Sequence, residues 1–139
     1  MTIKLLVIDD DVAVTDLLSL LLRSQGFEVS ATNNSAEGLS LIREQEPDLV
    51  VLDLMMPEMD GWEVCRSVRQ FSQVPIIILS ALNDPSMIAS VLDAGADDYL
   101  TKPTPSRVLV AHINRLTKRN GNQPSSALND SFSRPLPAS

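Results

Sequence analysis

Short apolar runs alternate with longer amphipathic segments along the first 119 residues. Several of the runs read without polar interruption, as expected of strands that are buried on both faces. The predicted strands span residues 4–9, 27–31, 48–53, 76–80 and 98–100. In the segments between and after them, apolar residues recur at helical spacing. The predicted helices span residues 11–24, 34–45, 61–71, 84–95 and 105–119.

Capping and turn residues mark several of the helix ends. Gly26 follows the first helix as a C-terminal stop. Asn34 is suited to the N-cap of the second helix, and Glu37 stands three residues on as its capping-box partner. Pro85 fits the first turn of the fourth helix. The apolar face of the first helix is predicted to consist of Val14, Leu17, Leu18, Leu21 and Leu22.

The alternation of strands and helices predicts an α/β fold. Strand–helix–strand order implies a parallel sheet with right-handed crossovers, so the sheet is doubly wound and helices cover both of its faces. We assign residues 1–119 to this one domain. Residues 120–139 are rich in Ser, Asn and Pro without an apolar period, which predicts a disordered tail or a linker. Such a segment is either a free tail or the cut end of a longer protein.

The composition of the chain limits which partners it is expected to bind and in which cellular compartment it is expected to lie. The chain has a formal net charge of −7 and an isoelectric point near 4.5. Without a basic stripe, this segment is not expected to bind nucleic acid directly or to bind an anionic membrane. Cys65 is the only cysteine, which excludes an internal disulfide and fits a reducing compartment. The N-terminal apolar run is too short for a signal peptide or a membrane span, so we expect a cytoplasmic protein.

Polar and charged residues stand at the predicted carboxyl ends of four strands. They are Asp9, Asp10 and Asp11 after the first strand, Asp53 at the end of the third, Ser80 at the end of the fourth and Lys102 after the fifth. Open parallel sheets bind ligands at this edge. Several carboxylates within a few ångströms of one another repel strongly unless a hard cation such as Mg²⁺ neutralises them. The pattern therefore predicts a magnesium site.

The same edge is suited to phosphoryl chemistry. A hydroxyl and an ammonium opposite a carboxylate-bound metal form a receptor for a phosphoryl group. Ser80 supplies the hydroxyl as a hydrogen-bond donor, and Lys102 supplies the ammonium. A carboxylate can itself be the nucleophile and form an aspartyl phosphate. Asp53 is therefore the candidate phosphoacceptor.

Four motifs carry a resemblance to a known family. They are, in order, VIDDD, DLMMPEMDG, IIILSA and GADDYLTKP. At these spacings they resemble the receiver domain of bacterial two-component response regulators, in a pattern closest to receivers of the winged-helix transcription-factor class. The resemblance covers residues 1–119 and implies a flavodoxin-like receiver fold, with five strands in the order 2-1-3-4-5 and five helices.

The resemblance also implies a set of roles at the metal and acceptor site. Asp9 and Asp10 form the acidic pair that holds Mg²⁺, together with Asp53 and the backbone carbonyl of Met55. Asp53 is the phosphoacceptor. Lys102 contacts the phosphoryl group through its ammonium. By the same resemblance Asp53, Ser80 and Lys102 carry the chemistry of phosphoryl transfer.

A second set of implied roles concerns switching. Ser80 is the switch hydroxyl and Tyr99 the switch aromatic. The peptide between Lys102 and Pro103 is expected to be cis, a geometry that X-Pro bonds tolerate and that aims Lys102 into the site. A sensor histidine kinase donates the phosphoryl group. The face made by the fourth helix, fifth strand and fifth helix then changes shape, and this face is also a possible homodimer surface.

The resemblance implies a signalling switch and not an enzyme. Its expected output is control of transcription through an attached or missing DNA-binding domain. Two alternatives remain open: a stand-alone receiver, or a phosphate-independent module, that acts by docking on another protein. An acid-nucleophile phosphatase is a further rival. Such enzymes need a second Asp two residues beyond the nucleophile, where this chain has Met55.

The chain departs from the family pattern at three places. Two residues after Asp53 and after Ser80, where fast-decaying receivers often carry polar side chains, stand Met55 and Leu82. We therefore predict slow self-dephosphorylation. The aromatic that usually follows Lys–Pro is replaced by Thr104, which removes packing near the site.

The third departure lies on the expected dimer face. Receivers of this class usually dimerise through charged residues of the fourth and fifth helices. The matching positions here are Ile88, Val108 and His112, while Asp97 and Asp98 remain. Either the dimer has a more apolar seam, or this face docks another protein.

Overall fold

The structure, a computed structural model, describes residues 2–119, so the predicted tail at 120–139 lies outside the described residues. The strands are β1 (Lys4–Ile8), β2 (Glu28–Thr32), β3 (Leu49–Leu52), β4 (Ile76–Ser80) and β5 (Asp98–Thr101). The helices are α1 (Val12–Ser24), α2 (Ser35–Gln45), α3 (Gly61–Arg69), α4 (Pro85–Asp93) and α5 (Ser106–Arg119). No helix within residues 2–119 is long and apolar enough to cross a membrane.

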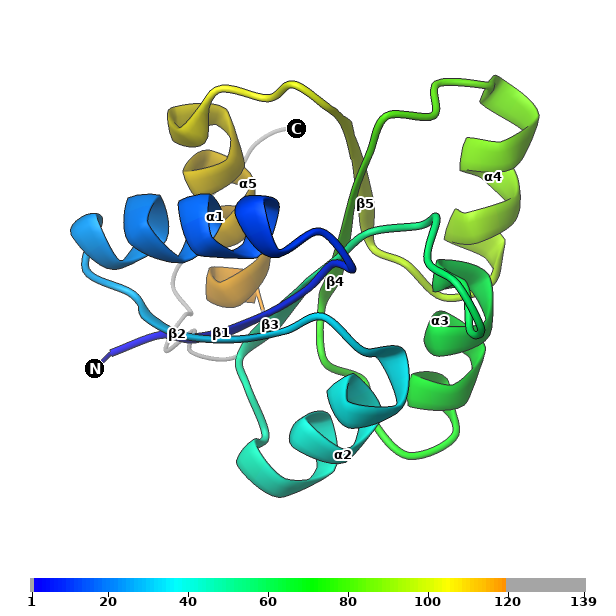
Figure 1. Ribbon diagram of the computed structural model, residues 1–139, viewed down its shortest axis with the longest axis horizontal. Helices are drawn as coiled ribbons and strands as arrows, with labels where there is room; N and C mark the ends of the chain where they lie inside the picture. Colours follow the sequence, from blue (N-terminus) through cyan, green and yellow to red (C-terminus); the bar gives the residue numbers. More distant parts are fainter. Residues whose placement is uncertain (1, 120–139) are drawn as a thin grey trace, which may run out of the picture.

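All five strands pair in parallel, in the order β2-β1-β3-β4-β5 (Figure 1). This confirms the predicted doubly wound α/β sheet. The predicted strand bounds are close to the observed ones, but β1 and β3 each stop one residue earlier than expected. Asp9 and Asp53 therefore lie just beyond the ends of their strands, at the edge of the sheet and outside its ladder.

Alternate residues of the strands build two cores, one on each face of the sheet. One face carries Leu6, Val50 and Ile78 beneath α2, α3 and α4. The opposite face carries Val7 and Val51 beneath α1 and α5. In Figure 1, α1 and α5 lie on one side of the sheet and α2 lies on the other. The central strands are buried on both faces, which is why their sequences are continuous apolar runs.

Helix α1 buries most of its predicted apolar face: Val14, Leu18 and Leu21 are half-buried, and Leu17 is the exception. Leu22 is fully buried, together with the small polar residues Thr15 and Ser19. Leu17, which was predicted to lie on the apolar face, is 56% exposed, and Leu20 is 67% exposed. The prediction for Leu17 was wrong because α1 is turned so that Thr15 and Ser19 face inward in its place. That orientation leaves an apolar surface facing outward.

The predicted capping box of α2 is only half formed. The side chain of Asn34 accepts a hydrogen bond from the Glu37 backbone N–H at 2.8 Å. The Glu37 carboxylate does not return to Asn34 but accepts a hydrogen bond from the Thr32 hydroxyl. A complete capping box instead begins α3, where Asp60 and Glu63 bond each other's backbone N–H.

Gly61 allows α3 to begin directly against the end of β3. Its N–H donates to the carbonyl of Leu54 at 2.9 Å. A Cβ at this position would lie 2.9 Å from the Leu54 Cα and 3.0 Å from the Asp53 carbonyl oxygen. Any larger residue would push the helix away from the end of β3, and the backbone around Asp53 with it. The glycine of DLMMPEMDG therefore shapes the backbone beside the candidate acceptor.

Candidate functional site

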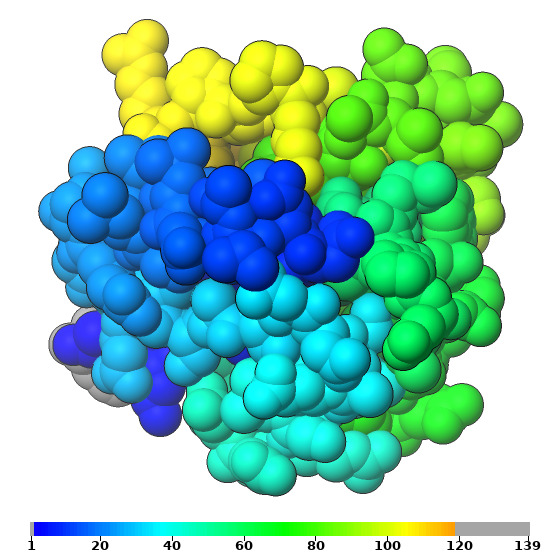
Figure 2. All heavy atoms as spheres, in the orientation of Figure 1, coloured from blue at the N-terminus to red at the C-terminus, as the bar shows by residue number. Residues whose placement is uncertain are grey.

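The loops that follow the strands meet at the carboxyl edge of the sheet. Figure 2 shows the segment after β1 at the middle of the visible face, with the segment after β2 below it, the loop between β3 and α3 to its right and the segment after β5 above. Residues far apart in the sequence are thereby placed side by side, as the parallel order of the strands requires.

Three carboxylates converge at this edge. Oxygen atoms of Asp9, Asp10 and Asp53 all lie within 4.8 Å of one another. Asp9 is 4% exposed and Asp53 is 8% exposed, while Asp10 is exposed. Carboxylate oxygens at this spacing are the hard ligands that Mg²⁺ takes, and one open side leaves room for water or a phosphate oxygen. The donor set therefore fits the magnesium ion that the sequence predicted.

The Lys102 ammonium provides positive charge beside these acids. Its Nζ lies 2.9 Å from Oδ2 of Asp9 and 3.7 Å from Oδ1 of Asp53. The Lys102–Pro103 peptide bond is cis. Burial lowers the pKa of Lys102, but the hydrogen bond to Asp9 and the charges of Asp53 and Asp9 outweigh burial, and the net pKa is raised. Lys102 therefore remains cationic beside the candidate acceptor.

The environment of Asp53 disfavours its ionised form. Burial and the neighbouring charge of Asp9 raise the pKa of Asp53 from 3.8 to about 6, although Lys102 and the Leu54 N–H act in the opposite direction. A carboxylate in this position gains stability from any added positive charge. Strongly shifted pKa values of this kind cluster at functional sites.

Ser80 and Tyr99 are joined through the loop between β4 and α4. Ser80 is 1% exposed, and its Oγ accepts a hydrogen bond from the Leu82 N–H at 3.3 Å. The Tyr99 hydroxyl donates to the Leu82 carbonyl at 2.5 Å. Tyr99 is half-buried and packs against the core on the α3 side of the sheet. The two candidate switch residues thus share one neighbour.

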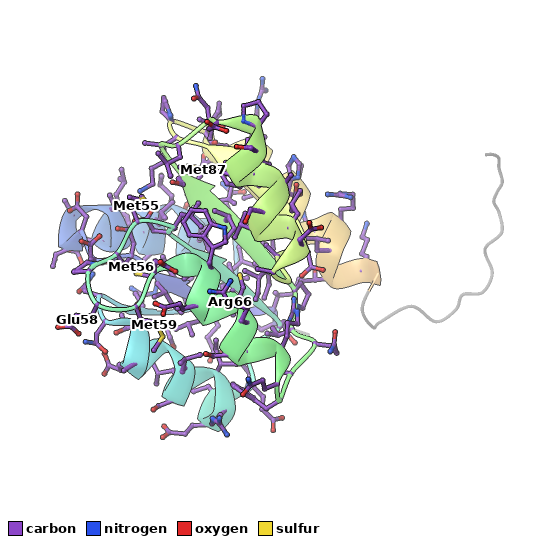
Figure 3. All side chains as sticks on the ribbon, turned by 90° about the vertical axis from the view of Figure 1, so that its right-hand side faces the viewer. Met55, Met56, Glu58, Met59, Arg66 and Met87 are labelled. Atoms are coloured by element: carbon purple, nitrogen blue, oxygen red, sulfur yellow. The ribbon has the colours of Figure 1, made fainter. Side chains whose placement is uncertain are left out.

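The remaining predicted ligand lies in the loop between β3 and α3. Figure 3 shows Met55, Met56 and Met59 along this loop, with Met87 at the start of α4. The Met55 side chain is 57% exposed, whereas Met56 is buried. The side chain of Met55 is thus turned to the surface, two residues beyond Asp53.

Asn33 is a contributor that the sequence reasoning missed. It follows β2, and its side-chain amide donates to the Asp9 carbonyl at 2.8 Å. The signal was available, because Asn33 is a polar residue at the carboxyl end of a strand, like the other site residues.

Comparison with known proteins decides the family. The family model of the response regulator receiver domain matches residues 5–114. The chain belongs to the response regulator receiver family. As a receiver domain it is a signalling module and not an enzyme. Receiver domains bind Mg²⁺ at an acidic pocket, and the cluster of aspartates in this receiver domain is in keeping with that property.

Relatives of this receiver domain are transcription regulators. The transcriptional regulatory protein AfsQ1 of Streptomyces coelicolor is 47% identical over 116 residues, which cover 84% of this chain and 52% of AfsQ1. The DNA-binding response regulator MtrA of Mycobacterium tuberculosis is 40% identical over 125 residues, which cover 90% of this chain and 55% of MtrA. The chain therefore spans about half the length of the curated relatives that it matches.

Solved structures agree on the fold. The receiver domain of the Francisella response regulator 1452 superposes with a TM-score of 0.82 at 35% identity, and the match covers 86% of this chain and 100% of that one. This likeness confirms the flavodoxin-like receiver fold that the motifs implied.

The acids of the expected dimer face of this receiver domain are paired within the chain. Asp97 accepts a hydrogen bond from Arg69 at 2.9 Å. Oδ2 of Asp98 lies 2.5 Å from Nδ1 of His112 and 2.8 Å from Nη2 of Arg115. The sequence pattern alone did not predict Arg115 as a partner for these acids. Both carboxylates thus have cationic or imidazole partners without a second subunit.

Proposed function

We propose that this receiver domain accepts a phosphoryl group on Asp53 in a Mg²⁺-dependent reaction. The observation that carries the proposal is the convergence of three carboxylates within 4.8 Å of one another, with the Lys102 ammonium 3.7 Å from Asp53. Asp9, Asp10 and Asp53 would hold the ion, together with the backbone carbonyl of Met55. When bound, Mg²⁺ neutralises charge on the carboxylates and on the phosphoryl oxygens.

The chemical step is a transfer between two nucleophiles. An oxygen of the Asp53 carboxylate attacks phosphorus, forming an O–P bond as the N–P bond of a phosphohistidine breaks. The imidazole leaves with the electron pair of that bond and takes up a proton. Lys102 shields the negative charge of the phosphoryl oxygens, and Ser80 donates a hydrogen bond to one of them.

The switch follows from the position of Ser80. When its hydroxyl turns toward a phosphoryl oxygen, the hydrogen bond from the Leu82 N–H is lost and the loop between β4 and α4 rearranges. Tyr99 bonds the carbonyl of the same Leu82, so its hydroxyl follows that loop. The added phosphoryl group thereby shifts the equilibrium between two arrangements of the α4–β5–α5 face.

The donor in this proposal is a sensor histidine kinase in the cytoplasm. A donor histidine must reach Asp53, so the kinase must cover the sheet edge where α1 begins. Val12, Leu17 and Leu20 of α1 are each more than half exposed, and the helix begins at that edge, so its outer surface offers apolar side chains to a partner there. We assign this surface to the kinase.

The output of the switch is proposed to be control of transcription, as the names of the relatives suggest for those proteins. DNA contact would be made by an output domain and not by residues 1–119, whose acidic character is unsuited to it. Residues 120–139 would form the tail or linker. Docking on another protein by a stand-alone receiver remains the second candidate, favoured by the exposed Met87, Leu92 and Val108 on α4 and α5.

The test is intact mass after incubation with acetyl phosphate, with and without Mg²⁺. Wild type is expected to gain one phosphoryl group only when Mg²⁺ is present, and Asp53→Asn is expected to gain none. Asp48→Asn is the matched control, because Asp48 precedes β3 at the opposite edge of the sheet and accepts a hydrogen bond from the Lys4 N–H. It should be phosphorylated like wild type.

Two outcomes would contradict the proposal. A gain of mass in Asp53→Asn would place the acceptor elsewhere. No gain in wild type, with no binding of Mg²⁺, would support the phosphate-independent docking module instead.

A further inference from the structure

The backbone of Asp9 is held by the neighbouring edge of β2. Its N–H donates to the Thr32 carbonyl at 3.2 Å. Its carbonyl accepts a hydrogen bond from the side-chain amide of Asn33 at 2.8 Å. Both polar backbone groups of Asp9 are therefore bonded to β2 and to the residue that follows it. The side chain of Asp9 takes no part in these two bonds and remains available to the metal site.

Asn33 connects this backbone to the start of α1. The same amide nitrogen lies 3.0 Å from Oγ1 of Thr15. Thr15 is 3% exposed, and its hydroxyl donates to the Val12 carbonyl at 3.1 Å. One side chain thus ties the end of β1 to the first turn of α1. The turn between them carries Asp10.

The carbonyl that Asn33 holds belongs to the peptide unit between Asp9 and Asp10. A peptide unit is planar, so fixing the direction of its oxygen fixes the rotation of the whole unit. That rotation sets the directions in which the two flanking carboxylates leave the chain. The two carboxylates repel each other when both are ionised, and a turn without this restraint would relax by moving them apart. A restrained pair binds a cation more tightly because less order is lost on binding.

We propose that Asn33 is a positioning residue for the metal site: it holds the Asp9–Asp10 peptide so that both carboxylates face the cation. The inference rests on the metal site of the proposed function. Asn33 would not be a ligand of the cation: its amide bonds the Asp9 carbonyl and Thr15, so its effect would pass through the backbone of Asp9.

The test compares Mg²⁺ affinity in Asn33→Ala and Asn34→Ala, measured on the full chain by titration of ¹⁵N–¹H NMR spectra. Asn34 is the adjacent residue and caps α2, so its loss should lower thermal stability without altering Mg²⁺ affinity. Asn33→Ala is expected to weaken Mg²⁺ binding about tenfold, in the range for loss of an outer-shell partner. Asn33→Ser, whose side chain is too short to reach the Asp9 carbonyl, serves if the alanine variant does not fold.

A second readout separates positioning from chemistry. With acetyl phosphate as donor, Asn33→Ala should need more Mg²⁺ for half-maximal phosphorylation but reach the wild-type rate at saturation. Asn33→Gln, which keeps the amide, should recover part of the affinity. Equal Mg²⁺ affinity in Asn33→Ala and wild type, or an equal loss in Asn34→Ala, would overturn the inference. A wild-type chain that binds no Mg²⁺ would overturn the proposed metal site and this inference with it, so the two failures are distinguishable.

Discussion

The Tyr99 hydroxyl and Ser80 are bonded to the carbonyl and the N–H of one residue, Leu82, in the loop between β4 and α4. We predict that Tyr99→Phe leaves phosphorylation of Asp53 intact but weakens its effect on α4. Loss of one hydrogen bond, worth about 1 kcal/mol, shifts a two-state equilibrium about fivefold.

Trp62 provides the measurement for this prediction. It is the only tryptophan, and its indole N–H donates to Ser90 of α4 at 3.1 Å. Its emission should change on phosphorylation in wild type and change much less in Tyr99→Phe. Thr104→Val is the control, because it removes another hydroxyl bonded to a backbone carbonyl, in the loop after β5. A wild-type response in Tyr99→Phe would show that the hydroxyl has no part in the coupling.

Asp53→Asn should raise thermal stability at about pH 7.5. The folded state raises the pKa of Asp53 from 3.8 to about 6, so it holds the proton more tightly than the unfolded state does. Stability therefore falls as the pH rises from about 4 to about 6 and stays lower above that range. The difference is at most about 3 kcal/mol. The gain of the variant over wild type should vanish near pH 4.

Melting curves across this pH range, with Asp16→Asn as an exposed control on α1, test the prediction. Added Mg²⁺ should stabilise wild type more than Asp53→Asn, because the variant lacks the negative charge of one of the proposed carboxylate ligands. A variant that melts below wild type at about pH 7.5 would mean that ionised Asp53 stabilises the fold.

The phosphorylated receiver should lose its phosphoryl group slowly. Met55 and Leu82, two residues beyond Asp53 and Ser80, offer no polar group to orient an attacking water. Met55→Asn should speed the decay several-fold, as followed by intact mass over time. Met87→Asn, at another exposed methionine, should not. Decay within seconds in wild type, with no acceleration in Met55→Asn, would refute the argument.

Substitution of the outward leucines of α1 should impair transfer from a kinase. Leu17→Ser and Leu20→Ser remove apolar surface that the fold does not bury, so stability should change by no more than about 0.5 kcal/mol. Transfer from the phosphorylated kinase that reacts fastest in a panel should slow about tenfold. Phosphorylation by acetyl phosphate should not change. Leu92→Ser on α4 is the matched control, and the same loss there would remove the assignment to α1.

Any dimer formed on phosphorylation should be insensitive to salt. Asp97 and Asp98 are already paired within the chain, so the seam would depend on apolar contacts such as those of Val108. Gel filtration at low and high salt, with and without phosphorylation, measures this. Val108→Asp should abolish the dimer. A dimer that dissociates at high salt would contradict an apolar seam, and a monomer throughout would favour docking on another protein.

The order of strands and helices was predictable for two reasons. Each buried strand is a continuous run of apolar residues, and apolar residues recur at helical spacing in each helix. Leu17 shows where this reasoning fails. A leucine-rich helix can be turned in more than one way, and here Thr15 and Ser19 are buried while Leu17 is exposed. That choice is made by packing and leaves no trace in hydrophobicity alone.

The candidate site was predictable to the extent that it depends on topology. Asp9, Asp53 and Lys102 follow strands, and parallel strands bring their carboxyl ends together whatever the helices do. The place of Asn33 at the end of β2 follows from the same topology, but its bonding partners, and those of Arg115, were not predictable in this way. They depend on the rotamer of a long or branched polar side chain and on which neighbour lies within its reach. No repeating pattern in the sequence indicates either of these.

The bond between Lys102 and Asp9 joins residues 93 positions apart. Between them the chain forms the other four strands, and the charged groups of the pocket come from three strand–helix units: Asp9 and Asp10 follow β1, Asp53 follows β3 and Lys102 follows β5. A chain that lacks one unit, or that has been cut before β5, keeps isolated carboxylates without the ammonium that balances them. Phosphoacceptance, as proposed here, would therefore require the whole domain to be folded, because the site does not exist in any fragment that lacks β1, β3 or β5.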